Sequence, residues 1–125
     1  MIIFPGLIGA VAISKSSVAV PRLDLQISTD YAASWQDGPV NDYSYFAGTT
    51  KSYDIRAVGI GTESIDISNS NGNFAATLSS YSITGNAFSN IQLYVNYSGF
   101  GSESSTITIY SQAAGGDSIT LNVYS

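Results

Sequence analysis

The sequence predicts an all-β domain, a single sandwich of about seven or eight short antiparallel strands. Apolar and polar residues alternate over short runs, beginning with Leu23, Leu25 and Ile27. Turn-forming residues separate these runs at intervals of roughly 8–12 residues, and no stretch shows the apolar period of a helix. A chain of 125 residues is the usual size of one domain and is long enough to bury a core without disulfides.

The individual strands are predicted from this alternation, in chain order. After the run at 23–28, residues 29–50 are rich in turn formers and are expected to be irregular. Further strands are predicted over residues 53–60, 65–67, 74–78, 81–83, 91–97, 106–110 and 119–123. The pair Asn71-Gly72 lies between two of these runs and is a strong hairpin signal, so we expect a hairpin there.

Residues 1–21 are predicted to form an extended apolar arm in front of a sandwich at residues 22–125. Its large apolar side chains are Ile2, Ile3, Phe4, Leu7, Ile8, Val11 and Ile13. The run is too short for a membrane span, and Pro5, Gly6 and Gly9 interrupt it.

Three interpretations of this arm remain. It is a docking arm for neighbouring subunits, which we favour, or the first strand of the same domain, or an uncleaved signal-like segment. A signal peptide usually begins with a positively charged stretch. This segment has none, because no Lys or Arg precedes Lys15.

The amino-acid composition limits the kinds of functional site and partner that are expected for this chain. The chain has no cysteine and no histidine, which excludes disulfides, zinc–thiolate sites and the usual proton shuttle at neutral pH. Its four basic residues do not cluster and its net charge is −5, so nucleic acid is not an expected partner. We therefore expect no enzyme activity, no catalytic residues and no cofactor. No metal site is predicted, although a calcium site that uses Asp66 or Asp117 between loops remains an alternative.

Aromatic residues gather in the irregular stretch and form a second candidate interface. They are Trp35, Tyr43, Tyr45 and Phe46, with Tyr31 close by in the sequence. Exposed Trp and Tyr side chains are typical of protein interfaces, and they also stack on sugars. The alternative is that Trp35 and Phe46 plug one end of the sandwich core.

Residues 51–125 carry a series of motifs in a recognisable order. They are Ser52-Tyr53-Asp54-Ile55, Gly59, Ile65-Asp66-Ile67-Ser68, Gly72-Asn73-Phe74, Leu78-Ser79-Ser80, residues 91–97, Gly101, residues 106–111 and Ala114-Gly115-Gly116. This series resembles the immunoglobulin-like (Ig-like) sandwich modules of tailed-phage virion proteins and bacterial surface proteins, over about 60% of the chain. The resemblance implies roles in adhesion, decoration or spacing, and it brings no catalytic residues.

The expected function is therefore that of a non-enzymatic virion structural protein. We favour a capsid decoration or cement protein, located on the capsid surface, whose arm docks onto the major capsid protein or other virion subunits. The alternatives are a phage tail or neck accessory protein, and a carbohydrate-binding or adhesive module of a bacterial surface protein. Self-association and a host glycan are further expected partners.

Overall fold

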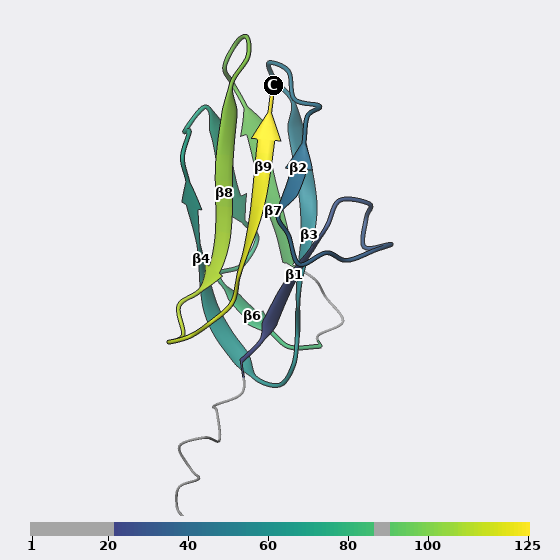
Figure 1. The fold of residues 1–125 in the computed structure, drawn as a ribbon, viewed down its shortest axis with the longest axis vertical. Helices are drawn as coiled ribbons and strands as arrows, with labels where there is room; N and C mark the ends of the chain where they lie inside the picture. Colours follow the sequence, from purple (N-terminus) through teal and green to yellow (C-terminus); the bar gives the residue numbers. More distant parts are fainter. Residues whose placement is uncertain (1–21, 87–90) are drawn as a thin grey trace, which may run out of the picture.

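Alternating side chains build two β-sheets that face each other across one apolar core (Figure 1). The computed structural model describes residues 22–86 and 91–125, and within these ranges every element of regular structure is a strand. The all-β prediction is confirmed. The predicted arm at residues 1–21 lies outside the described residues.

The first sheet has four strands in the order β1-β3-β7-β5. Their bounds are Asp24–Ser28 for β1, Thr50–Val58 for β3, Ile91–Tyr97 for β7 and Phe74–Leu78 for β5. All neighbouring pairs in this sheet are antiparallel. Its inward row includes Tyr53, Ile55 and Ala57 of β3, which are buried as their alternation predicts.

The second sheet has five strands in the order β2-β9-β8-β4-β6. Their bounds are Val40–Asp42 for β2, Ser118–Tyr124 for β9, Ser104–Ser111 for β8, Thr62–Asn69 for β4 and Ser82–Thr84 for β6. The inward side chains of β8 and β9 close the core from this side, among them Ile107, Ile109 and Leu121.

Strand β2 corrects two expectations. Residues 29–50 are not irregular throughout, because Val40–Asp42 forms a strand. This strand also runs parallel to β9, with Val40 opposite Leu121, so the sandwich is not antiparallel everywhere. A three-residue strand has no visible alternation of its own, and Val40 is recruited because its side chain enters the core beside β9.

The hairpin predicted at Asn71-Gly72 is wrong. Strands β4 and β5 flank this turn but belong to different sheets: β4 pairs with β8, and β5 pairs with β7. The turn is a corner that carries the chain from one sheet to the other. The side chains of Asn71 and Asn73 bind the carboxylate of Glu103 instead of closing a two-residue loop.

One close approach at the opposite end of the sandwich depends on a glycine. A β-carbon on Gly85 would lie 2.2 Å from the carbonyl oxygen of Gly59, which is closer than atoms can pack. The two chain segments therefore touch through their backbones. Among the described residues there is also no helix long and apolar enough to cross a membrane.

Candidate interaction surface

The side-chain positions show what the carboxylates considered for a calcium site contact. No group of three or more Asp or Glu residues in the described part of the chain is placed to hold a metal ion. The two residues of the calcium alternative accept backbone hydrogen bonds: Asp66 Oδ1 accepts the N–H of Ile67 at 2.8 Å, and Asp117 Oδ2 accepts the N–H of Leu25 at 2.8 Å. Both carboxylates thus serve the strands beside them.

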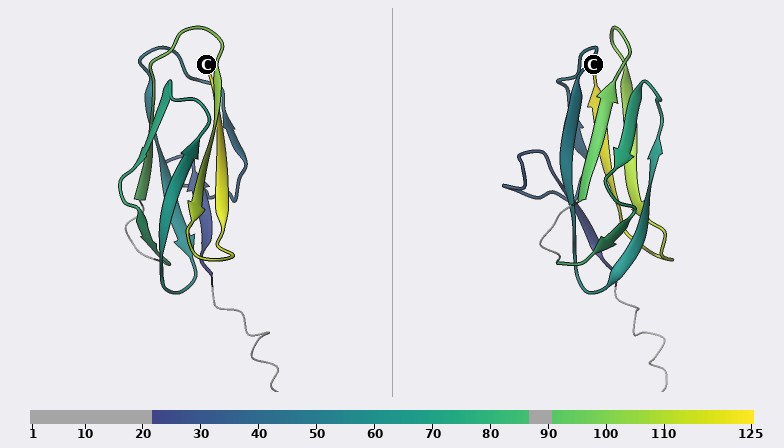
Figure 2. Two further views of the ribbon diagram at one scale, coloured as in Figure 1. Left: turned by 90° about the vertical axis from the view of Figure 1, so that its left-hand side faces the viewer. Right: turned by 180° about the vertical axis from the view of Figure 1, so that it is seen from behind.

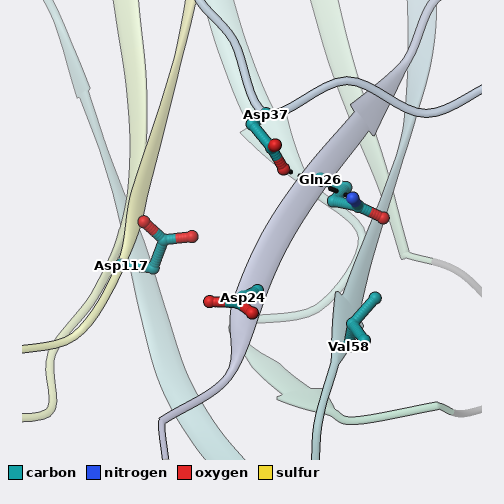
Figure 3. A pocket seen from close by; sticks show the side chains of 5 residues that line it. All are labelled: Asp24, Gln26, Asp37, Val58 and Asp117. Atoms are coloured by element: carbon teal, nitrogen blue, oxygen red, sulfur yellow. Dashed lines mark hydrogen bonds between the residues drawn. The ribbon is translucent and has the colours of Figure 1, made fainter.

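An acidic hollow of about 390 Å³ lies beside β1. Figure 3 shows Asp24 and Gln26 on β1, with Asp37 close to Gln26 and Asp117 across the hollow. Gln26 Nε2 donates to Asp37 Oδ1 at 3.3 Å, and Asp117 is held by the β1 backbone. The side chains that line the hollow are three carboxylates, an amide and a valine, so its lining carries negative charge.

The structure separates the four aromatic residues of the predicted domain interface. Tyr45 is only 4% exposed, and its hydroxyl lies 2.6 Å from that of Tyr53. Its assignment as an interface residue is therefore corrected to a core residue. Trp35 is half-buried, and the guanidinium of Arg56 lies over one face of its ring at 4.4 Å from the centroid.

Tyr43 and Phe46 remain as surface residues, 70% and 71% exposed. Phe46 therefore does not plug the core, contrary to the alternative expectation. Sequence reasoning missed a third residue, Phe100, which is 85% exposed. The signal for it was present in Gly99-Phe100-Gly101, where a large apolar side chain stands alone between two glycines in a loop.

These three residues define the aromatic end of the sandwich. Tyr43 and Phe46 belong to the loop after β2, and Phe100 belongs to the loop between β7 and β8. Both loops lie at the end of the molecule where the C-terminal residue Ser125 is found (Figures 1 and 2). A group of large exposed apolar side chains on one end of a domain is typical of an interaction site.

Backbone hydrogen bonds join the loop after β2 to Tyr97, the last residue of β7. The N–H of Gly48 donates to the carbonyl of Tyr97 at 2.9 Å, and the N–H of Tyr97 donates to the carbonyl of Thr49 at 2.9 Å. On the other side, the ring of Tyr43 stacks on that of Tyr124 at 4.4 Å with an interplanar angle of 10°. The backbone of this loop and the ring of Tyr43 are thus held in place, which reduces the entropy that they lose on binding.

Glu103 fixes the loop that carries Phe100. Its carboxylate accepts hydrogen bonds from the hydroxyl of Tyr97 at 2.6 Å, from Nδ2 of Asn73 at 2.9 Å and from Nδ2 of Asn71 at 3.1 Å. Led by the bond from Tyr97, these three donors lower the pKa of Glu103 to about 2. The carboxylate therefore stays ionised in the folded protein far below the pH at which an ordinary glutamate is protonated.

We expect Glu103→Gln to be less stable than the wild type at pH 7 and to match it near pH 2. A carboxylate whose folded pKa is depressed stabilises the fold above its ordinary pKa of 4.5, and this contribution is lost as the pH falls through about 2. The difference in urea midpoint between the two proteins, measured at several pH values, should close over that window. A difference that stays constant from pH 7 to pH 2 would contradict this role for Glu103.

The exposed edge of β1 offers little main-chain docking. Its outward N–H groups already donate to other groups of the domain: Leu23 to Glu63 Oε2 at 3.0 Å, Leu25 to Asp117 Oδ2 at 2.8 Å, and Ile27 to the carbonyl of Gln36 at 2.9 Å. An edge strand whose donors are satisfied is a poor template for an added strand. Partners must therefore contact this edge through side chains.

Some backbone groups of β4 and β5 are also bonded within the domain. On β4, the N–H of Ile67 donates to the carboxylate of Asp66. On β5, Nδ2 of Asn69 donates to the carbonyl of Phe74 at 2.7 Å, and the N–H of Phe74 donates to the carbonyl of Asn71 at 3.0 Å. The large exposed side chains of the aromatic end remain a candidate surface for a partner.

Comparison with known proteins does not assign this chain to a family. No protein-family model matches the chain, and no curated protein matches it in sequence.

Proposed function

We propose that this chain is a non-enzymatic virion structural protein, an Ig-like sandwich that docks into a larger particle through its N-terminal arm. A capsid decoration or cement protein on the capsid surface is the form we favour. Its partners would be the major capsid protein or other virion subunits. A tail or neck accessory protein would use the same arm and the same rigid body.

The strand order supports the Ig-like part of this proposal. Ig constant-type domains place strands A, B, E and D in one sheet and strands C, F and G in the other. Here β1-β3-β7-β5 gives the order A-B-E-D, and β4-β8-β9 gives the order C-F-G. The short strands β2 and β6 are additions to the two outer positions of the second sheet.

The observation that carries the docking role is a contrast between the domain and the segment before it. Along the open edge of β1, the N–H groups of Leu23, Leu25 and Ile27 donate within the domain. The preceding 21 residues contain the seven large apolar side chains of the predicted arm. Each would contribute about 1.5–3 kcal/mol when buried in a partner, which is more than the sparse surface charges of this chain supply.

A glycan-binding or adhesive module of a bacterial surface protein is the second candidate function. The observation that favours it is the Tyr43 ring, which is stacked flat on Tyr124 and open to solvent on its other face. Trp35 supports this candidate less than Tyr43, because its side chain is half-buried and Arg56 lies over one face of its ring.

The test compares the full-length chain with Leu7→Ser/Ile8→Ser in binding to capsid shells stripped of this subunit. Loss of two buried aliphatic side chains should weaken binding by at least about 100-fold. Tyr31→Ser is the matched control, because it removes a large side chain that is 90% exposed and belongs to the described part of the domain. Equal binding of the arm variant and the wild type would refute the docking role.

A further inference from the structure

We propose that a small polar hollow beyond the end of β1 binds one neutral sugar unit, which stacks on the ring of Tyr31. The hollow has a volume of about 240 Å³. Docking onto a particle does not require this site, so the inference goes beyond the proposed function and does not depend on it. The lining does not include Tyr43, and the residues in it that carry the argument are Thr29, Tyr31, Asp42, Lys51, Ser52 and Tyr53.

The hollow exists because β1 is shorter than its neighbour β3. Pairing between these strands ends with Ser28 opposite Asp54, whereas β3 begins at Thr50 and pairs with β7 on its other side. Beyond Ser28 the chain leaves the sandwich in a loop that projects from its side (Figures 1 and 2). The edge of β3 at residues 50–53 is therefore left without a neighbouring strand, and these residues line the hollow.

This open edge presents a main-chain donor and a main-chain acceptor to the hollow. The N–H of Tyr97 donates to the carbonyl of Thr49, so the odd-numbered residues here direct their backbone groups towards β7. Because the direction alternates along a strand, the N–H and C=O of Ser52 point to the open side. Among the described residues neither group has a hydrogen-bond partner. The hydroxyl groups of Thr29 and Ser52 add further donors and acceptors.

The charges of the lining balance, which selects a neutral ligand. The carboxylate of Asp42 accepts hydrogen bonds from Lys51 Nζ at 2.9 Å and from the Tyr53 hydroxyl at 2.7 Å. Lys51 thus neutralises the one carboxylate of the hollow. The domain around it is acidic, because residues 22–125 carry nine acidic and three basic residues. An anionic sugar would be repelled by this excess charge, whereas a neutral sugar would not.

Tyr31 supplies the apolar face that a sugar ring needs. Its side chain is 90% exposed and lines the hollow. Tyr31 and Ala32 have φ angles of 58° and 67°, a left-handed conformation that is uncommon for a bulky residue. Ser28 Oγ holds this turn by accepting the N–H of Ala32 at 2.9 Å. Strain of this kind is concentrated at binding sites, and the C–H face of a pyranose packs on an aromatic ring while its hydroxyl groups stay free for hydrogen bonds.

The size of the hollow favours one sugar unit over a larger ligand or a peptide strand. Sites for drug-sized ligands have volumes of about 300–1,000 Å³, and this hollow is smaller. An added peptide strand needs a row of main-chain partners. Of the open residues 50–53, only Thr50 and Ser52 point their backbone groups to the open side. A compact ligand with several hydroxyl groups uses this short edge better than an extended chain does.

The test is a titration of the ¹⁵N-labelled full-length chain, followed by nuclear magnetic resonance. The probes are the methyl glycosides of glucose, galactose and mannose, together with N-acetylglucosamine and the anionic glucuronic acid. We expect at least one neutral sugar to shift the amide signal of Ser52 with a Kd of about 1–10 mM, as suits a ligand of this size. Glucuronic acid should bind at least about 10-fold more weakly than that sugar.

Two variants remove different parts of the site. Tyr31→Asn loses the ring but keeps a residue that tolerates the left-handed conformation, and it should weaken sugar binding at least about 10-fold. Ser52→Leu keeps Tyr31 and fills the hollow from β3, and it should also weaken binding at least about 10-fold. Tyr31→Phe keeps the ring and should bind like the wild type. Phe100→Ser is the matched control, because it removes another aromatic side chain that is 85% exposed and should leave sugar binding unchanged.

The inference is overturned if no neutral sugar shifts the Ser52 signal, or if Tyr31→Asn and Ser52→Leu bind as well as the wild type. It is also overturned if Tyr43→Ser abolishes sugar binding while Tyr31→Asn does not, which would place the sugar at Tyr43. If an uncharged (Thr-Val)₃ peptide shifts the Ser52 signal and no sugar does, the open edge accepts a strand and the inference fails. Binding of the arm variant to stripped capsid shells is a separate measurement, so the inference and the proposed function can fail independently.

Discussion

Replacing Phe74 with alanine should lower the free energy of unfolding by about 3–5 kcal/mol, the usual cost of removing a buried phenylalanine. Phe74 is fully buried on β5. Its ring stacks on Tyr97 at 4.3 Å and meets the edge of Tyr45 at 5.5 Å. Alanine would leave a cavity between these two rings, because both are held by hydrogen bonds from their hydroxyl groups and cannot move in to fill it. Urea unfolding followed by circular dichroism measures the change.

Phe46→Ala is the matched control, since it makes the same chemical change at the aromatic end. Because the Phe46 ring lies mostly in solvent, we expect a change within about 0.5 kcal/mol. Phe74→Leu should lie between the two variants, because leucine keeps part of the buried volume. A loss below about 1 kcal/mol for Phe74→Ala would mean that the stack of Tyr45, Phe74 and Tyr97 does not hold the core together.

The long strands could be predicted from the sequence because the alternation of apolar and polar residues that specifies a strand lies within its own residues. In β8, Ile107 and Ile109 alternate with Thr106 and Thr108, and the structure buries both isoleucines while the alternate residues face outward. Such a pattern fixes which face of the strand is buried, whatever its partner is. It does not say which strand lies alongside, and this is the reason that the hairpin expected at residues 70–73 turned out to be a corner between sheets.

The stretch from Asp42 to Phe46 shows where local information is insufficient. Tyr43, Tyr45 and Phe46 are similar side chains within four positions of the sequence, yet Tyr45 is buried and the other two are exposed. The difference depends on distant partners: Tyr45 meets Tyr53 and Phe74, whereas Tyr43 stacks on Tyr124. Parallel pairing of β2 with β9, about 80 residues further along the chain, places these partners, and no pattern within residues 40–46 encodes it.

Replacing Asp42 with asparagine should lower the free energy of unfolding by about 2–3 kcal/mol at pH 7, in the range found for hydrogen bonds to charged groups. The Asp42 carboxylate accepts hydrogen bonds from Lys51 Nζ at 2.9 Å and from the Tyr53 hydroxyl at 2.7 Å. Asp42 lies on β2 and the two donors on β3, so these bonds join the two sheets. The variant leaves the partly buried ammonium of Lys51 without its counter-charge.

The effect of Asp42→Asn should depend on pH with a definite sign. Burial by itself would raise the pKa of Asp42, but hydrogen bonds from Ser44, Lys51 and Tyr53 outweigh it and lower the pKa to about 2. A depressed folded pKa means that the carboxylate stabilises the fold above its ordinary pKa of 3.8 and loses this contribution as the pH falls towards 2. The gap between wild type and variant should therefore be full at pH 7 and nearly closed at pH 2.

A double-mutant cycle with Lys51→Met separates the ion pair from the rest of this network. If Asp42 and Lys51 act together, the double variant loses less stability than the two single variants added, by about 1 kcal/mol or more. Additive losses, or a gap for Asp42→Asn that does not change with pH, would show that the pair does not stabilise the fold. The stability of the parallel strand β2 would then depend on the burial of Val40 against β9, and Val40→Ala would become the more damaging substitution of the two.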